Sequence, residues 1–228
     1  MIMNQKQLAA EKSIEFIKNG MTLGLGTGST VYFLVNKLSS LIKQGLDVKC
    51  VSTSRQTTEL AEGLGIKIIN INMVDKIHLT IDGADEVDPN LNGIKGGGGA
   101  LLFEKVTATA SEKVIWIIDS SKYVKQLGAF PLPVEVIPFG SNHIFKKFSE
   151  AGYNPRIRKI GEDIYLTDSG NEIIDLRLNA IKDSVKLEKE IKMIPGVVEV
   201  GLFNNIADTV IIGRENSTEI LYRTRAKS

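Results

Sequence analysis

The sequence holds little that would tie the chain to an oxidising compartment, a membrane or a polyanion. One cysteine, Cys50, leaves no partner for an internal disulfide. No run approaches the roughly 18 consecutive apolar residues of a membrane-spanning helix, and the first residues lack the apolar core of a signal peptide. Lys and Arg number 28 against 27 Asp and Glu, a balance that gives no support for nucleic acid or an anionic membrane as the main partner. We therefore expect a soluble, cytoplasmic protein in which any anion site is local.

Side chains that commonly bind metals or act as nucleophiles are also scarce. Cys50 lies in "DVKCVST", the pattern of a buried strand, and no base neighbours it in sequence. We interpret it as a packed thiol rather than a nucleophile. The two histidines, His78 and His143, are far apart in the sequence, and no His, Cys and carboxylate cluster has metal-ligand spacing. The sequence therefore predicts neither a metal nor another cofactor, and two structural or surface histidines.

Strands and helices alternate through the first half of the 228 residues. We expect helices over 5–18, 30–44, 55–63 and about 100–111, between the strands "MTLGLG", "DVKCVST", "IKIINI", "KIHLTID" and "EKVIWIID". This alternation is typical of a parallel, doubly wound sheet with both faces covered. Further on, the order becomes β-α-β-β-α-β, that of a ferredoxin-like unit. We predict an α/β fold: a Rossmann-like, mainly parallel domain over 1–128 and 205–228, with a smaller α+β domain inserted at 129–204.

The ends of the inserted unit also carry expectations. "VVEVGLF" reads as its last strand, and strands at 208–213 and 218–223 should return to the first domain. A ferredoxin-like sheet leaves one face uncovered by its own helices. Because a bare apolar face is poorly tolerated in water, this face should pack on the main domain or on another subunit.

The first candidate for chemistry is "GLGTGST", Gly24 to Thr30, where a strand enters and a helix leaves. Hydroxyls beside the N–H groups at a helix start form a phosphate cradle. The alternative is a tight turn with a capping hydroxyl. The motif is not a P-loop, because no lysine follows the last glycine, and Ser29 stands where a dinucleotide fingerprint needs its third glycine.

The second candidate is "TIDGADEVDP", in which Asp82 and Asp85 follow an apolar strand. In an open α/β sheet, ligands bind beyond the carboxyl ends of the strands, so these carboxylates fall where chemistry is expected. Glu86 and Asp88 make the segment strongly acidic. Turn-forming aspartates or a metal site are the alternatives.

The third and fourth candidates are "KGGGGALLFEKV" and "IIDSSK". Four consecutive glycines carry a large entropic cost, and the apolar segments around them argue against a slack linker. We infer that a ligand lies against this backbone between Lys95 and Glu104. The alternative for Glu104 is an ordinary exposed helix residue. Lys122, after the strand "VIWIID", is either a surface lysine or a cation placed against a charged ligand group.

Taken together, these motifs resemble the ribose-5-phosphate isomerase type A family. The segments "GLGTGST", "TIDGADEVDP", "IKGGGGALLFEKV", "IIDSSK", "FPLPVEVIP" and "IPGVVEVGLF" occur in that family's order and spacing, over nearly the whole chain. The family fold is similar to the predicted one, with the inserted α+β unit as a lid. The resemblance implies an aldose–ketose isomerase of the non-oxidative pentose phosphate pathway. It also implies a cis-enediolate intermediate, no metal or redox cofactor, and a homodimer or homotetramer.

The resemblance further implies roles for individual residues. Glu104 matches the proton-transferring base, which takes the C2 proton and returns it to C1. Lys95 and loop N–H groups would stabilise the negative charge that develops on oxygen. Asp82 would manage hydroxyl protons, including ring opening, and Asp85 would orient hydroxyls. The implied substrate-binding residues are Lys6, Thr27, Gly28, Ser29, Thr30, Asp82, Gly83, Ala84, Asp85, Lys95, Gly96, Gly97, Gly98 and Lys122.

One position departs from the family pattern, and other functions stay open. Phe103 stands where members often carry arginine, which leaves the base in place and the charge around it open. A related sugar-phosphate isomerase or deaminase, or a coenzyme A transferase-like protein, would use the same fold, although Glu104 with Lys95 and the acidic loop favours isomerisation. A non-catalytic sugar-phosphate sensor would normally carry a DNA-binding element, and the sequence shows no helix-turn-helix segment or basic patch.

Overall fold

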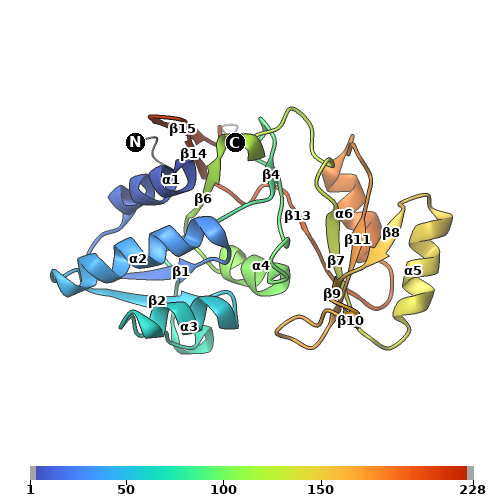
Figure 1. Ribbon diagram of the computed structural model, residues 1–228, viewed down its shortest axis with the longest axis horizontal. Helices are drawn as coiled ribbons and strands as arrows, with labels where there is room; N and C mark the ends of the chain where they lie inside the picture. Colours follow the sequence, from blue (N-terminus) through green and yellow to red (C-terminus); the bar gives the residue numbers. More distant parts are fainter. Residues whose placement is uncertain (1–3, 225–228) are drawn as a thin grey trace. The chain divides into compact units, whose positions relative to one another are not determined.

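The computed structural model describes residues 4–224, and in it the chain forms two units (Figure 1). The first unit holds the chain up to Ala84, the segment Phe103–Tyr123 and the chain from Asn205 on. The second unit holds Asp85–Leu102 and Val124–Asn204. Residues 85–102 thus group with the second unit, whereas the sequence predicts them in the first domain.

A small antiparallel sheet explains this grouping. In it β4 (Glu86–Val87) pairs with β5 (Gly93–Ile94), and β5 pairs with β13 (Leu202–Phe203). The Lys95 N–H also donates to the Gly201 carbonyl over 2.9 Å. The segment before the glycine run is therefore hydrogen-bonded to the last strand of the second unit.

The first unit is built on a six-stranded sheet in the order β15-β14-β6-β3-β1-β2. Neighbouring strands are parallel except β15, which runs antiparallel to β14. The mainly parallel α/β sheet predicted from the alternating pattern is confirmed, and both strands expected near the C-terminus add to it. The strands are β1 (Met21–Leu25), β2 (Val48–Ser52), β3 (Leu79–Asp82), β6 (Val114–Asp119), β14 (Thr209–Gly213) and β15 (Thr218–Tyr222).

Two helices of this unit begin at capping side chains. The Asn4 side chain accepts the Lys6 N–H at the first helix, and Ser54 accepts the Thr57 N–H at the third. The helices are α1 (Gln5–Ser13), α2 (Ser29–Lys43), α3 (Arg55–Gly63) and α4 (Leu101–Thr109), which starts in the second unit's segment, with 3-10 turns η1 (Ile14–Phe16), η2 (Ile71–Met73) and η3 (Ser120–Lys122).

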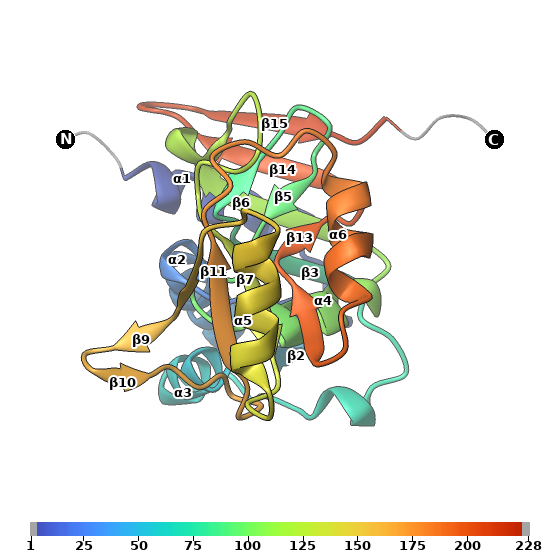
Figure 2. The same ribbon diagram turned by 90° about the vertical axis from the view of Figure 1, so that its right-hand side faces the viewer.

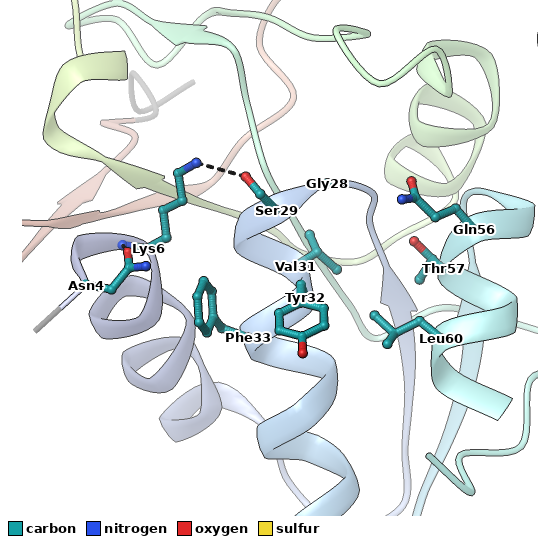
Figure 3. Close-up of a pocket in the computed structure, with 10 residues that line it drawn as sticks. All are labelled: Asn4, Lys6, Gly28, Ser29, Val31, Tyr32, Phe33, Gln56, Thr57 and Leu60. Carbon is teal, nitrogen blue, oxygen red and sulfur yellow. Dashed lines mark hydrogen bonds between the residues drawn. The ribbon is translucent and has the colours of Figure 1, made fainter. Parts of the chain in front are cut away.

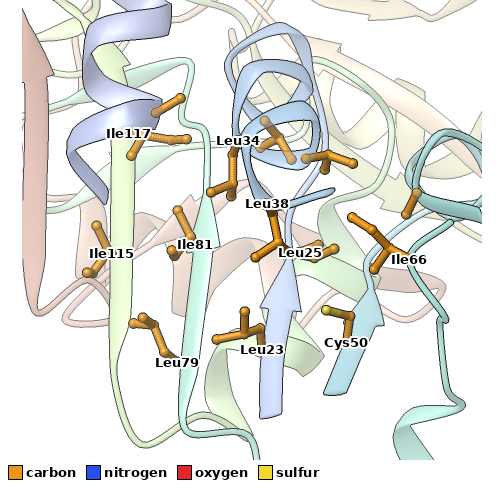
Figure 4. Close-up of a cluster of buried hydrophobic side chains, with 14 of the residues drawn as sticks. Leu23, Leu25, Leu34, Leu38, Cys50, Ile66, Leu79, Ile81, Ile115 and Ile117 are labelled. Carbon is orange, nitrogen blue, oxygen red and sulfur yellow. The ribbon is translucent and has the colours of Figure 1, made fainter. Parts of the chain in front are cut away.

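One apolar cluster joins the sheet to α2. Figure 4 shows Leu34 and Leu38 of this helix packed against side chains of β1, β3 and β6. Leu34 and Leu38 are four residues apart, one turn, so they share a face. Cys50 of β2 is fully buried in the same cluster, and burial raises the pKa of its thiol to about 12. The thiol therefore stays protonated at neutral pH, which confirms its interpretation as a packed residue.

The main sheet of the second unit has four antiparallel strands in the order β12-β7-β11-β8, which fits the predicted ferredoxin-like order. Figure 2 shows α5 and α6 on one face of β7 and β11, where Phe148 and Ile191 meet Val134 and Ile174. The elements are β7 (Leu132–Val136), α5 (Ser141–Glu150), β8 (Pro155–Ile157), β9 (Lys159–Ile160), β10 (Asp163–Ile164), β11 (Glu172–Leu176), α6 (Ser184–Lys192) and β12 (Val197–Val200), with β9 and β10 forming a hairpin.

The glycine segment covers part of the opposite sheet face. Pro133 and Glu135 alternate along β7 with the residues that face the helices, and both are buried. A Cβ atom at Gly96 would lie only 3.3 Å from Cβ of Pro133. Part of the face expected to need cover is thus covered within the second unit, and its packing on another subunit stays a prediction.

Two predicted strands differ in the structure. "IKIINI" forms only one isolated bridge, between Cys50 and Ile68, because the Asn70 side chain accepts the Asn72 N–H and starts η2. "VVEVGLF" divides at Gly201 into β12 and β13, which lie in different sheets. Gly201 donates its N–H to Pro133 and accepts that of Lys95, so the chain changes sheets there. A Cβ atom on Gly201 would overlap the Lys95 carbonyl.

No helix within residues 4–224 combines the length and apolar character needed to cross a membrane.

The contact between α1 and β14 gives a stability test. A Cβ atom at Gly213 would overlap the backbone carbonyl of Gln5, which cannot move as a side-chain tip could. Gly213→Ala should therefore lower the free energy of unfolding by about 1–3 kcal/mol. At Gly63, in α3, a Cβ atom meets nothing within 4 Å, so Gly63→Ala should stay neutral or gain up to about 1 kcal/mol. Urea unfolding measures both, and equal stabilities would contradict this packing.

Candidate active site

The predicted site residues of the first unit gather where parallel strands end. Thr27 follows β1, Asp82 is the last residue of β3, and Lys122 ends the 3-10 turn that follows β6. Carboxyl ends of parallel strands meet at one edge of the sheet, the usual ligand-binding edge of such folds. The order β6-β3-β1 makes these strands direct neighbours.

The start of α2 has the properties of an anion site. Gly28 caps the helix with φ of 114°, a conformation that favours glycine, and has no side chain to cover the helix end. The first helical hydrogen bond runs from the Tyr32 N–H to the Gly28 carbonyl. The N–H groups of Ser29, Thr30 and Val31 therefore have no acceptor within the helix. Such N–H groups and the helix dipole attract phosphate.

A lysine adds charge to this helix start. Nζ of Lys6, on α1, donates to Oγ of Ser29 over 2.9 Å. Figure 3 shows the two side chains meeting above a pocket of about 580 Å³. Gln56, Thr57 and Leu60 of α3 line its other side. The pocket therefore offers a cation, hydroxyls and backbone donors at one end and apolar walls below.

Asp82 is a buried carboxylate that joins two loops. Its Oδ1 accepts the N–H of Thr27 over 3.0 Å and that of Gly83 over 2.7 Å, and the residue is 2% exposed. A Cβ atom on Gly26 would overlap this carboxylate. The glycine before Thr27 thus lets the β1 loop close onto the end of β3.

A cluster of hydroxyl groups surrounds Thr27 and was not predicted. Its Oγ1 lies 2.8 Å from the hydroxyl oxygens of both Thr53 and Ser54, and the Thr57 hydroxyl donates to the Gly26 carbonyl. The sequence carries a signal for it, because Thr53 and Ser54 follow β2 directly, at the same sheet edge as the other loops. These hydroxyls fix the loop that carries the anion site.

Glu104 lies on α4, at the same end of the first sheet as Asp82. Ser111, past the helix end, bridges Ile77, which precedes β3, whereas Thr107 approaches Gly24 of β1, which is level with Thr80 within β3. The helix therefore runs antiparallel to these strands, and Glu104, one turn before Thr107, lies nearer their carboxyl ends. Glu104 is only 4% exposed. The alternative of an ordinary exposed helix residue is wrong.

The residues on either side of Glu104 in the sequence differ in solvent exposure. Lys105 is 9% exposed rather than a solvated partner, and Phe103 is 40% exposed. The aromatic ring at 103 therefore brings no charge to the base and lies largely at the surface. Lys122 is half-buried in η3, where the preceding Ser120 donates to the Gln5 side chain.

The second unit brings together the other predicted residues. Oδ2 of Asp85 accepts the Gly97 N–H over 2.8 Å, so the acidic loop holds the glycine run directly. Lys95 is 2% exposed and its Nζ lies 5.4 Å from the centre of the Phe203 ring, a cation–π contact. The chain passes between the units after Ala84 and again after Leu102.

Two acidic residues of the loop have structural roles. Oδ1 of Asp88 accepts the N–H groups of Asn90 and Asn92, as in a turn-forming aspartate. Both oxygens of buried Glu86 accept backbone N–H groups, from Gly128 and Phe130, over 2.7 Å. Glu86 therefore anchors the segment that leads into β7.

The two histidines lie where a structural and a surface residue are expected. Nδ1 of His78 accepts the Thr22 N–H over 2.9 Å, and His143 is exposed on α5. These are the structural and surface roles predicted for them. Across residues 4–224, no three or more His, Cys, Asp or Glu side chains are placed to hold a metal ion. The absence of a metal requirement stays a prediction.

Fold and site together define a class. A mainly parallel α/β sheet with a cationic helix start and buried carboxylates at its carboxyl edge is typical of enzymes that act on small phosphorylated substrates. The model of the ribose 5-phosphate isomerase A (phosphoriboisomerase A) family matches residues 49–217. The chain belongs to this family.

Individual relatives align with this chain over nearly their whole length. Ribose-5-phosphate isomerase A of Lactiplantibacillus plantarum is 50% identical over 223 residues, which cover 96% of this chain and 98% of the relative. A solved D-ribose-5-phosphate isomerase in complex with phospho-erythronic acid is 39% identical, with a TM-score of 0.93 over 97% of this chain and 100% of that one. Ribose 5 phosphate isomerase A of Neisseria gonorrhoeae is 40% identical, with a TM-score of 0.90 and coverage of 99% and 100%.

The anion site predicts ion-dependent stability. Inorganic phosphate or sulfate should raise the melting temperature, because an anion that binds only the folded state stabilises it. Lys6→Ala should weaken this binding about tenfold by removing one charged donor. Lys12→Ala is the control, since Lys12 lies in the same helix but pairs with Glu15 at 2.8 Å. Identical anion responses in the two variants would contradict the role given to Lys6.

Proposed function

We propose that the chain interconverts D-ribose 5-phosphate and D-ribulose 5-phosphate in the non-oxidative pentose phosphate pathway, in the cytoplasm. The observation that carries the proposal is the position of Glu104, a buried carboxylate on α4 near the carboxyl ends of the strands that place Thr27 and Asp82. An isomerase of this kind needs one base within reach of two adjacent carbons, and a single buried carboxylate suits that task.

The phosphate would bind first, at the start of α2. The N–H groups there, the Ser29 hydroxyl and the Lys6 ammonium supply hydrogen bonds to phosphate oxygens. Lys122, after the neighbouring β6, would add a second positive charge. Binding energy from the phosphate would hold the sugar chain over the strand ends, which orients its carbons for proton transfer.

The proton then moves without a change in overall composition. Glu104 removes the proton from C2 of the open-chain aldose, and the electrons form the C1–C2 double bond of an enediolate with negative charge on O1. Proton exchange between O2 and O1 and return of the Glu104 proton to C1 give the ketose. Atoms and electrons balance, so the step needs no oxidant or reductant.

The remaining residues would stabilise charge and move hydroxyl protons. Lys95 and the Gly98 N–H group of the glycine run would face the developing oxyanion, where fixed donors contribute most. Asp82, held by Thr27 and Gly83, would accept and return hydroxyl protons, including those of ring opening. Asp85, which holds Gly97, would orient the sugar hydroxyls together with Gly96 and Gly98.

A relative's ligand supports the enediolate. The relative in complex with phospho-erythronic acid is 39% identical to this chain. That acid carries a phosphate at one end and a planar carboxylate at the other. Its two carboxylate oxygens resemble those of an enediolate, so it suits a site built for that intermediate.

The proposal also covers the role of the second unit and the oligomeric state. The second unit would act as a lid and contact surface, and the protein would be a homodimer or homotetramer. Light scattering at micromolar concentration measures the mass, and a value near the 25.0 kDa of one chain would contradict the assembly.

Glu104→Gln tests the base. The amide keeps the shape of the side chain but cannot take a proton, so kcat should fall by about 10²–10⁴ while sugar-phosphate binding is kept. Glu112→Gln is the control, because Glu112 lies just beyond α4 on the surface and pairs with Lys76. The assay follows ketopentose formation from ribose 5-phosphate. Near-normal turnover in Glu104→Gln would show that Glu104 is not the base.

Chelation tests the absence of a metal step. Activity should survive exhaustive dialysis against EDTA, since the proposed charge stabilisation uses Lys95 and backbone N–H groups. Loss of turnover that a divalent cation restores would overturn this part of the proposal.

A further inference from the structure

One arginine outside the predicted site contacts the glycine run. Arg158 follows β8, about 60 residues after the run in sequence. Its Nη1 donates to the Gly96 carbonyl over 2.7 Å and to the Gly97 carbonyl over 3.2 Å. Both contacts lie within the second unit. A single guanidinium group therefore binds two consecutive peptide groups of the run.

The guanidinium is itself held in place. Its Nε and Nη2 donate to the two carboxylate oxygens of Asp175, over 3.0 and 2.5 Å, in the fork arrangement that gives arginine its directionality. The side chains of Arg158 and Asp175 are 15% and 18% exposed. The Tyr165 ring lies 5.9 Å from the guanidinium carbon. These contacts orient the guanidinium before any ligand binds.

The contacts of Arg158 with the two carbonyl groups also fix the direction of the N–H groups on the other side of the run. In a trans peptide the C=O and N–H groups point in opposite directions. Because the Gly96 and Gly97 carbonyls point to Arg158, the N–H groups of Gly97 and Gly98 point away from it. The Gly97 N–H meets the Asp85 carboxylate over 2.8 Å. Arg158 and Asp85 thus hold one peptide group from its two sides.

Tyr165 fixes the end of the run. Its hydroxyl lies 3.4 Å from the Gly98 carbonyl, at the limit of a hydrogen bond, and its ring occupies the space that a Cβ atom on Gly99 would need. Gly99 has φ of 82°, so a side chain there would also be strained. Arg158 and Tyr165 flank the hairpin of β9 and β10.

A glycine run without such contacts would be the most mobile backbone of the chain, because glycine restricts φ and ψ least. Donors stabilise a developing charge only when they are oriented beforehand. The proposed reaction requires donors of the run that are oriented before the substrate binds, and the contacts of Arg158 supply that orientation.

We propose that Arg158 is a positioning residue, which orients the Gly98 N–H group and, through the Gly97 N–H, the Asp85 carboxylate for the isomerisation. The inference rests on the proposed function, in which these groups face the sugar. Arg158 acts through the backbone and needs no contact with substrate.

The test compares variants of two nearby arginines. Arg158→Met keeps the aliphatic length of the side chain and removes every donor, whereas Arg158→Lys keeps the charge but not the fork. Arg156→Met is the control, because Arg156 lies two residues earlier in β8 and is exposed. We expect kcat of Arg158→Met to fall about 10- to 100-fold with KM changed less than threefold, since misplaced groups cost rate rather than phosphate binding. Arg158→Lys should be intermediate and Arg156→Met unchanged.

A second measurement does not depend on activity. Amide hydrogen exchange at Gly97, whose N–H donates to Asp85, should be at least tenfold faster in Arg158→Met and Arg158→Lys than in the control, with equal protection in β6. Added guanidinium ion at millimolar concentration should partly restore kcat of Arg158→Ala, which a loss of general stability would not allow.

The outcomes separate the two proposals. A wild-type protein that does not isomerise ribose 5-phosphate overturns the proposed function and, with it, the role of Arg158 in that reaction. An active wild type with unchanged kcat in Arg158→Met, or unchanged exchange at Gly97, overturns the positioning role alone. If Arg158→Met does not fold, the same criteria apply to Arg158→Lys.

Discussion

The site of the first unit depends on one buried carboxylate. Asp82 ends β3 and accepts the N–H groups of Thr27 and Gly83, so it fixes the loop after β1 and the loop after β3 at once. A carboxyl oxygen that accepts two backbone N–H groups is a strong, directional link, and its burial makes the loss of either donor costly. Gly26 has no Cβ atom because this carboxylate occupies its place. The hydroxyl network of Thr27 and the start of α2 follow from this link.

In the second unit, as at Gly26, neighbouring side chains fill the space beside the glycines of the run. Asp85, Pro133 and Tyr165 each occupy space that a side chain on the run would need, at Gly97, Gly96 and Gly99 respectively. The chain's own packing therefore explains three of the four glycines before any ligand is considered. The hypothesis that a ligand lies against this backbone remains compatible with that packing, because Gly97 and Gly98 are exposed.

The sequence could predict the sheet and most of the site because both depend on local patterns. Apolar strands followed by glycine or acidic residues mark the strand ends, and the family resemblance singles out Glu104 among many glutamates. Arg158 and Asp175 could not be found this way, since their approach to Gly96 depends on the register of β8 against β11. "IKIINI" has strand composition, and the side chain of Asn70 starts a turn there instead. The grouping of residues 85–102 likewise depends on the distant pairing of β5 with β13.

The central claim is proton transfer by one carboxylate, and isotope incorporation tests it most directly. Ribose 5-phosphate is converted in D₂O, and the C1 position of the ribulose 5-phosphate formed early in the reaction is examined by NMR or mass spectrometry. Proton transfer through Glu104 predicts deuterium at C1 in part of the product, on one face of the carbon only, because some of the protonated base exchanges with solvent before it returns its proton. Deuterium on both faces of C1 would mean that more than one group delivers the proton, and it would contradict the account.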